Sequence, residues 1–415
     1  MNRNPLKLVA LLLLVFTTVL GACSTTADEG PPKRFMIEWE DHTVVVNDDP
    51  LFESASVDAR NIPPGTFGSE YARMTKLSDK EWMIVYTVYR NQGYFEDDKG
   101  GTSLEVAISK DKGRSWKAIS TISDPGRDVD NGQIVKLKNG DLLLAARSVR
   151  WQESYRLPVY KSKDKGRTWT KLSEIDTNEG KPGSLGDPDK GVYEPYFQML
   201  DKGELAVFYA NEKHVTGTPA YSQIISEKIS KDNGKTWGEE IFVAWTPDDA
   251  AARPGMPISS KLKNGQYTVA FEVCGTYNCN IFVKNAKDGK TWESGIGTQV
   301  PVQSGGPYVT ALKDGSLILT SNSNEVSLSL DNGASWELNP IAPWNGTFPQ
   351  YLWASLYQTG TDEIASVNAT PPRARRASGR NPVREDHGAT CSVAIVAITK
   401  RRSSFNWRTI VFFAL

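Results

Sequence analysis

Ser109-Lys-Asp111-Lys-Gly113-Arg-Ser115-Trp116 is the first copy of an octapeptide that recurs along the chain. Three further copies read SKDKGRTW at 162–169, SKDNGKTW at 230–237 and SLDNGASW at 329–336, and a degraded fifth copy, NAKDGKTW, lies at 285–292. The tryptophans that end successive copies are 53, 68, 55 and 44 residues apart, by subtraction of their numbers. One supersecondary unit that recurs at roughly 40–50 residues is typical of a propeller or another repeat array.

Each residue type in the octapeptide has a local structural reason. The Asp side chain accepts hydrogen bonds from backbone N–H groups two or three residues further on, which holds a tight turn. Gly adopts a positive φ without steric cost, and the Trp brings a large apolar area that packs between neighbouring sheets. We therefore interpret the octapeptide as a turn between two strands. The alternative is a carbohydrate or metal loop, because Asp and Trp also serve such sites.

The repeated octapeptide resembles the Asp-box of the sialidase superfamily. This resemblance implies an all-β fold, a six-bladed β-propeller, and residues 35–370 would form it as one catalytic domain. Segments rich in β-branched and aromatic residues between Gly, Asp and Asn turns support strands throughout. We expect the strand-like segments 35–40 and 43–46 to complete the last blade. The resemblance says less about chemistry, because enzymes and non-enzymatic propellers share this element.

Residues 1–23 are predicted to be a signal peptide rather than part of the fold. An apolar run from Leu8 to Leu20 follows Arg3 and Lys7 and is too short to span a bilayer comfortably. The next residues end in Cys23 and resemble a bacterial lipobox, which implies a lipid anchor on Cys23 and an exported lipoprotein on the outer face of the cell membrane. Residues 24–34 have the polar composition of a tether. The alternative is a plain signal peptide in which the Cys is incidental.

Composition excludes several classes of function. The 48 basic and 49 acidic residues give a net charge of −1, so no nucleic-acid partner is expected. Only three His occur, at 42, 214 and 387, far apart and without i,i+4 spacing. A His-based zinc site and a Ser-His-Asp triad are therefore not expected. We predict no cofactor, no metal and a monomer.

The remaining cysteines carry one prediction. Cys274 and Cys279 lie across a short Gly-containing turn, which in an exported protein favours a disulfide. Two free thiols are the alternative, and Cys391 has no partner.

The pattern changes near residue 370. Residues 371–382 are rich in Arg and Pro, and segments 391–399 and 409–413 are strand-like but lack an octapeptide. Residues 371–415 are thus an atypical tail. They are either unusual outer strands of the last blade or the product of a slipped reading frame.

Glu194 and Glu272 are the candidate catalytic residues. Glycoside hydrolysis usually needs two carboxyl groups flanking the scissile bond. Both glutamates are embedded in apolar strand sequence, VYEPYF and AFEVCG, where a purely solvating Glu is unusual. Glu194 is predicted to be the nucleophile, because neighbouring tyrosine hydroxyls would stabilise its charged form. Glu272, in a drier setting, is predicted to be the acid/base. The alternative is a pair of buried structural acids.

Four short segments resemble the exo-α-1,5-L-arabinanase family of propeller glycosidases: Tyr71-Ala-Arg73, Tyr193-Glu194-Pro195, 271–275 (FEVCG) and 305–308 (GGPY). The resemblance implies hydrolysis of arabinan-type polysaccharide from a chain end, with retention, by two Glu that match Glu194 and Glu272. The candidate substrate-binding residues are Arg73, Tyr193, Arg253, Tyr308 and Trp353.

Two alternatives remain. Sialidases resemble the chain in the octapeptide, and Arg73 and Arg253 match a carboxylate-binding role, but blade five offers no arginine at 306–310. The other alternative is a sugar-binding propeller without catalysis, which needs aromatic platforms and no paired acids.

Overall fold

The computed structural model describes residues 37, 43–46, 68–89, 93–94, 97–340, 342, 353–361, 363–367 and 392–394. The signal peptide, Cys23, the tether, Cys391 and most of the tail lie outside the described residues. Apart from short 3-10 turns, the described secondary structure is all β.

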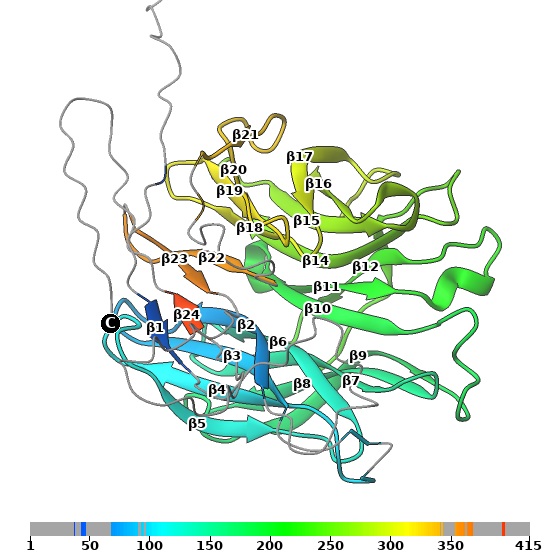
Figure 1. Ribbon diagram of the computed structural model, residues 1–415, viewed down its shortest axis with the longest axis horizontal. Coiled ribbons are helices and arrows are strands. Elements are labelled where there is room, and N and C mark those ends of the chain that lie inside the picture. The colour runs from blue at the N-terminus through cyan, green and yellow to red at the C-terminus, as the bar shows by residue number, and fades with distance from the viewer. Residues whose placement is uncertain are drawn as a thin grey trace, which may run out of the picture.

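Five four-stranded antiparallel sheets follow one another along the chain, each an up-and-down meander in sequence order (Figure 1). The first sheet holds β2 (Gly68–Lys76), β3 (Trp82–Tyr89), β4 (Ser103–Ser109) and β5 (Lys117–Ile122). The second holds β6 (Asp128–Lys136), β7 (Leu142–Arg150), β8 (Ser154–Ser162) and β9 (Thr170–Glu179). The third holds β10 (Val192–Met199), β11 (Leu205–Asn211), β12 (Ile224–Ser230) and β13 (Ile241–Ala244).

The fourth sheet holds β14 (Arg253–Lys261), β15 (Tyr267–Cys274), β16 (Asn280–Ala286) and β17 (Thr298–Ser304). The fifth holds β18 (Tyr308–Ala311), β19 (Leu317–Thr320), β20 (Val326–Ser329) and β21 (Glu337–Leu338). Two shorter sheets pair β22 (Ser355–Gln358) with β23 (Ile364–Val367), and β1 (Thr43–Val45) with β24 (Ser392–Ala394). The 3-10 turns are η2 (Asp201–Gly203), η3 (Lys213–Thr216) and η4 (Gly275–Tyr277).

The sheets are blades of a propeller. Their first strands contact one another in chain order, and β22 contacts both β18 and β2, which closes the ring. The predicted propeller is therefore confirmed, but the prediction of six complete blades is not: five four-stranded blades are present among the described residues. At the sixth position the described residues form a two-stranded sheet, β22–β23. Strand β24, which pairs with β1, contacts β23 but is not hydrogen-bonded into the same sheet.

The core lies between neighbouring blades. Second strands such as β7 and β11 are sandwiched on both faces, which explains their continuous apolar runs, Leu142–Ala146 and Leu205–Ala210, every residue of which is buried. These rigid strands fix the positions of the first strands that they pair with.

Each octapeptide joins the third and fourth strands of a blade, as the repeat predicts. In the first copy, Asp111 accepts hydrogen bonds from the Ser115 N–H (2.9 Å) and hydroxyl (2.6 Å), and the Gly113 N–H donates to Ser109 Oγ (2.7 Å). These bonds to the charged carboxylate lower the pKa of Asp111 to about 2. The octapeptides also link blades, because Trp169 Nε1 donates to Ser120 Oγ of the preceding blade (3.1 Å).

Candidate active site

Each of the six blade positions has a residue with a positive φ either within its first strand or two residues before it. In β2, β6, β10 and β14 this residue lies in a β-bulge, where the pairing with the second strand shifts. The six residues are Tyr71 (φ 52°), Asn131 (51°), Glu194 (59°), Met256 (54°), Gly306 (44°) and Trp353 (55°). A small residue or a proline follows each of them: Ala72, Gly132, Pro195, Pro257, Pro307 and Ala354. We call these six residues the bulge ring.

The bulge ring surrounds a pocket at one end of the propeller. Five of its members, all except Gly306, line the pocket together with Glu70, Thr87, Asp130 and Arg147. Because the strands of a blade alternate in direction, the octapeptide turns lie at the opposite end of the blades, and none of them lines this pocket. The pocket is the candidate site.

Glu194 reaches the pocket from the bulge of β10. Its Oε2 accepts a hydrogen bond from the backbone N–H of Met256 on the next blade (2.6 Å). Burial is the main reason why the pKa of Glu194 rises from 4.5 to about 7, and the charge of Glu272 raises it further, against the Met256 N–H and Arg147, which lower it. Near neutral pH this carboxyl group can therefore hold a proton or release it.

Glu272 approaches the same point from the second strand of the next blade, β15. Its Oε2 accepts a hydrogen bond from the Gly306 N–H (2.6 Å). A Cβ at Gly255 would lie 3.6 Å from Glu194 Oε2 and 3.6 Å from Glu272 Oε1, so these two oxygens are at most twice that distance, 7.2 Å, apart. The structure therefore brings the two predicted acids together beside Gly255, where a Cβ would also lie 2.7 Å from Gln223 Nε2.

Burial also raises the pKa of Glu272, and the Gly306 N–H opposes this rise. The charge of Glu272 is one of the causes that raise the pKa of Glu194, so the two carboxyl groups titrate as a coupled pair.

Asp130 and Arg147 form a second charged pair in the pocket that the sequence analysis missed. Arg147 Nη2 donates to Asp130 Oδ2 (2.7 Å), and the charge of Asp130 raises the pKa of Arg147 despite burial. The guanidinium also lies 5.8 Å from the ring centres of Trp151 and Tyr193. The signal that could have found this pair is Asp130-Asn131-Gly132, which occupies the same place in its blade as Tyr193-Glu194-Pro195 does in the next.

Two of the predicted binding residues lie behind the pocket. Arg73 is 2% exposed, donates through Nη1 to the Ala72 and Trp353 carbonyls (2.9 Å each), and its guanidinium carbon lies 4.0 Å from the Tyr71 ring centre. Tyr308 is 5% exposed and packs against Tyr196 and Tyr357. Both support the pocket wall and neither lines it.

Two others lie beside the pocket. The Tyr193 hydroxyl donates to Glu212 (2.9 Å), and Arg253 Nη2 donates to the same carboxyl group (2.5 Å) and to Gln223 (3.0 Å). The side chain of Arg253 is 41% exposed. Trp353 alone among the five predicted binding residues lines the pocket. Its backbone N–H donates to Asn322 Oδ1 (2.7 Å).

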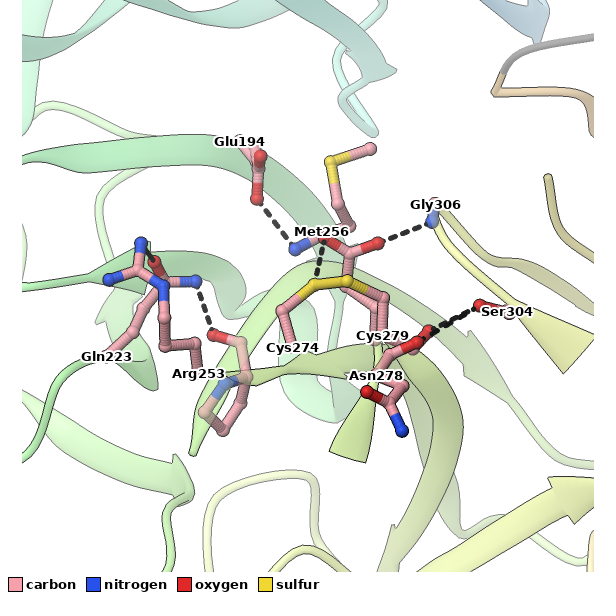
Figure 2. Close-up of a disulfide and its surroundings, with 11 residues drawn as sticks. Glu194, Gln223, Arg253, Met256, Cys274, Asn278, Cys279, Ser304 and Gly306 are labelled. Atoms are coloured by element: carbon pink, nitrogen blue, oxygen red, sulfur yellow. Dashed lines mark hydrogen bonds between the residues drawn. A yellow bond between two sulfur atoms is a disulfide. The ribbon is translucent and has the colours of Figure 1, made fainter. Parts of the chain in front are cut away.

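Cys274 and Cys279 form a disulfide (Figure 2), and Cys274 Sγ lies 3.6 Å from Glu272 Oε1. Within the described ranges, no group of three or more His, Cys, Asp or Glu side chains is placed to hold a metal ion. The same residues include no helix that is both long enough and apolar enough to cross a membrane.

Comparisons with known proteins give the fold a context. Residues 74–268 match a sequence profile described as a BNR repeat-like domain. No curated protein sequence matches the chain.

Among solved structures, an α-L-arabinofuranosidase from Fusarium graminearum in complex with an iminosugar inhibitor is 21% identical, with a TM-score of 0.66 over 87% of this chain and 98% of its own. An α-L-arabinanase from Penicillium chrysogenum complexed with arabinobiose is 20% identical, with a TM-score of 0.66 over 88% and 98%. A sialidase from Streptococcus pneumoniae is 12% identical, with a TM-score of 0.54 over 85% and 70%. The predicted resemblance is confirmed at the level of the fold, which this chain shares with arabinanase-type and sialidase propellers.

Proposed function

We propose that this chain is a retaining glycoside hydrolase that acts from a chain end on arabinan-type polysaccharide, with Glu194 and Glu272 as its catalytic pair. One observation carries the proposal: the two carboxyl groups come from adjacent blades and meet across Gly255, beside a pocket at the propeller mouth. Two carboxyl groups on either side of a glycosidic bond are the usual requirement for its hydrolysis. Arabinan is chosen because proteins of similar fold act on arabinosides.

The electrostatics support a division of roles opposite to the one predicted from sequence. A carboxyl group with a pKa of about 7 suits the proton donor, so Glu194 would take that role and the Glu272 carboxylate would attack the anomeric carbon. Glu194, with a pKa of about 7, would donate its proton to the glycosidic oxygen as that bond breaks. Glu194 would then take a proton from water, whose oxygen attacks the glycosyl–Glu272 ester and releases the sugar with retention.

Sialidase activity is the alternative that the fold allows. Sialidase-type sites use three arginines on the substrate carboxylate. Of the described residues that line this pocket, one is an arginine, Arg147, and it already pairs with Asp130. Arg73 is buried against carbonyl groups, and Arg253 pairs with Glu212. This argues for a neutral sugar. A sugar-binding propeller without catalysis does not explain the two convergent acids.

We extend the proposal to the architecture and the location. The sixth blade would be completed by β24 and β1 beside β22 and β23, which the contact between β23 and β24 and the sixth bulge residue, Trp353, support. The protein would be an exported monomer held on the outer face of the cell membrane through Cys23, which residues 1–23 support.

Product analysis on a panel of glycans tests the activity. Incubation with arabinan oligosaccharides, sialyl-lactose and unrelated glycans, followed by mass spectrometry, should release arabinose or arabinobiose from the first alone. The matched control is Glu272→Gln, which should release neither. Sialic acid release would favour the alternative, and no hydrolysis of any glycan despite sugar binding would refute catalysis.

A further inference from the structure

The disulfide closes a loop that begins where Glu272 ends its strand. Cys274 is the last residue of β15, two residues after Glu272, and the chain turns through η4 before Cys279 leads into β16. Cys274 Sγ lies 3.6 Å from Glu272 Oε1. The sulfur therefore limits where the carboxyl group can move on one side.

The far end of the loop is linked through Gly305 and Gly306 to the other carboxyl oxygen of Glu272. The Cys279 carbonyl accepts a hydrogen bond from the Gly305 N–H (2.8 Å), and the next N–H, of Gly306, donates to Glu272 Oε2 (2.6 Å). Ser304 Oγ adds bonds to the carbonyls of Asn278 (3.4 Å) and Cys279 (3.3 Å). Figure 2 shows Ser304 beside Asn278 and Cys279, with Gly306 following toward the site.

The Gly305–Gly306 turn needs glycine at both positions. Both residues have positive φ, 72° and 44°, and a Cβ on Gly306 would lie 2.6 Å from Trp353 Cδ1. The Gly305 carbonyl accepts from the Asn322 N–H (2.8 Å), so the turn has a second support besides the Cys279 carbonyl. Loss of the disulfide should therefore loosen the turn without releasing it.

We infer that the Cys274–Cys279 disulfide positions Glu272 for the reaction, by fixing the loop whose carbonyl holds the Gly305–Gly306 turn against its carboxyl group. The inference rests on the proposed function. It does not extend to Glu194, whose support, the Met256 N–H, comes from β14. Of the charged groups on the neighbouring strands, Glu194 on β10 has an oxygen within 7.2 Å of Glu272 Oε1, and Arg253 on β14, which lies opposite Cys274 in the sheet, is paired with Glu212.

The test compares oxidised protein with the double variant Cys274→Ala, Cys279→Ala. The Gly306 N–H stabilises the charged form of Glu272, so a weakened bond raises the pKa of this group, and the acid limb of the kcat/KM profile moves to higher pH. On that limb kcat/KM should fall by up to about tenfold, through kcat rather than KM, because complete loss of one backbone hydrogen bond to a carboxylate would change its pKa by about one unit. The alkaline limb, which reports Glu194, should stay in place.

Ser304→Ala is the graded variant, because it removes the side-chain bonds to the loop and keeps the disulfide. It should shift the acid limb in the same direction by less. The double variant treated with reductant is the control for the other two cysteines, and it should show no further change. The inference would be overturned if the double variant had a lower melting temperature and lost the same fraction of kcat/KM at every pH. That result would indicate a disulfide that only stabilises the fold.

A measurement without substrate separates this inference from the proposed function. The carboxyl carbons of [δ-¹³C]glutamate-labelled protein are titrated by NMR, with the Glu272 signal assigned through Glu272→Gln. If the protein hydrolyses no glycan but the Glu272 titration moves to higher pH in the double variant, positioning holds and the proposed function fails. If the titration does not move, positioning is refuted whatever the activity.

Discussion

The charge of Glu272 raises the pKa of Glu194, which predicts how Glu194 responds when Glu272 loses its charge. In Glu272→Gln the carboxylate that raises the pKa of Glu194 is gone. The oxygens are at most 7.2 Å apart, twice the 3.6 Å from each to the Cβ position at Gly255. Coulomb's law at that distance gives about 2.3 kcal/mol at an effective dielectric constant near 20 and about 0.6 kcal/mol at that of water. At about 1.4 kcal/mol per unit, the pKa of Glu194 should fall by ~0.4 to ~1.7 units.

The assay is the same carboxyl NMR titration, with the Glu194 signal assigned through Glu194→Gln. The wild-type signal should titrate near pH 7 and the Glu272→Gln signal clearly lower. Arg147→Met is the control of opposite sign, because the guanidinium lowers the pKa of Glu194 and its removal should raise it. A wild-type Glu194 that titrates near 4.5, or one that does not respond to Glu272→Gln, would refute the coupling and the roles derived from it.

Four further outcomes are expected. Above pH 7, kcat/KM should fall tenfold per pH unit as Glu194 loses its proton, which a pH profile on an aryl arabinoside checks. Glu194→Gln should stabilise the protein at pH 8 by about 1–3 kcal/mol and leave its stability unchanged at pH 4. The raised pKa of Glu194 penalises folding only where the pH is above the pKa of this group in the unfolded chain. A urea titration that finds equal effects at both pH values contradicts this. Asp232→Ala should cost about 1–2 kcal/mol of stability, since it loses several turn hydrogen bonds, while kcat and KM stay unchanged. Trp353→Ala should raise KM about three- to tenfold with a stable fold, as measured by initial rates and thermal melting.

The sequence predicted the blade order well because the octapeptide is a local signal. Its Asp, Gly and Trp act within eight residues, so their spacing identifies the turn between the third and fourth strands without any tertiary information. The described strands of the last blade contain no octapeptide. The described residues there form a two-stranded sheet, β22–β23, and not the complete blade that was predicted.

The site was predictable only in part, for a physical reason. Glu194 and Glu272 stood out as acids in apolar strands; Glu194 lines the pocket, and Glu272 lies beside Glu194 without lining it. Arg73 and Tyr308 were expected at the same mouth, but strand sequence does not tell which face of a bulged strand a side chain takes. The bulge reverses the usual alternation, so Arg73 turns inward against the Trp353 carbonyl.

The bulge ring also bears on how such a propeller changes its chemistry. Its six members are an acid, an amide, a thioether, a phenol, an indole and a glycine, which share a backbone angle and no chemical property. A positive φ costs a non-glycine residue about 1–2 kcal/mol at each position, and the blades carry that cost whichever side chain is present. Replacing one of the five members that line the pocket therefore alters what the mouth recognises without repacking the space between blades. Divergence in substrate can proceed one position at a time on a scaffold that stays intact.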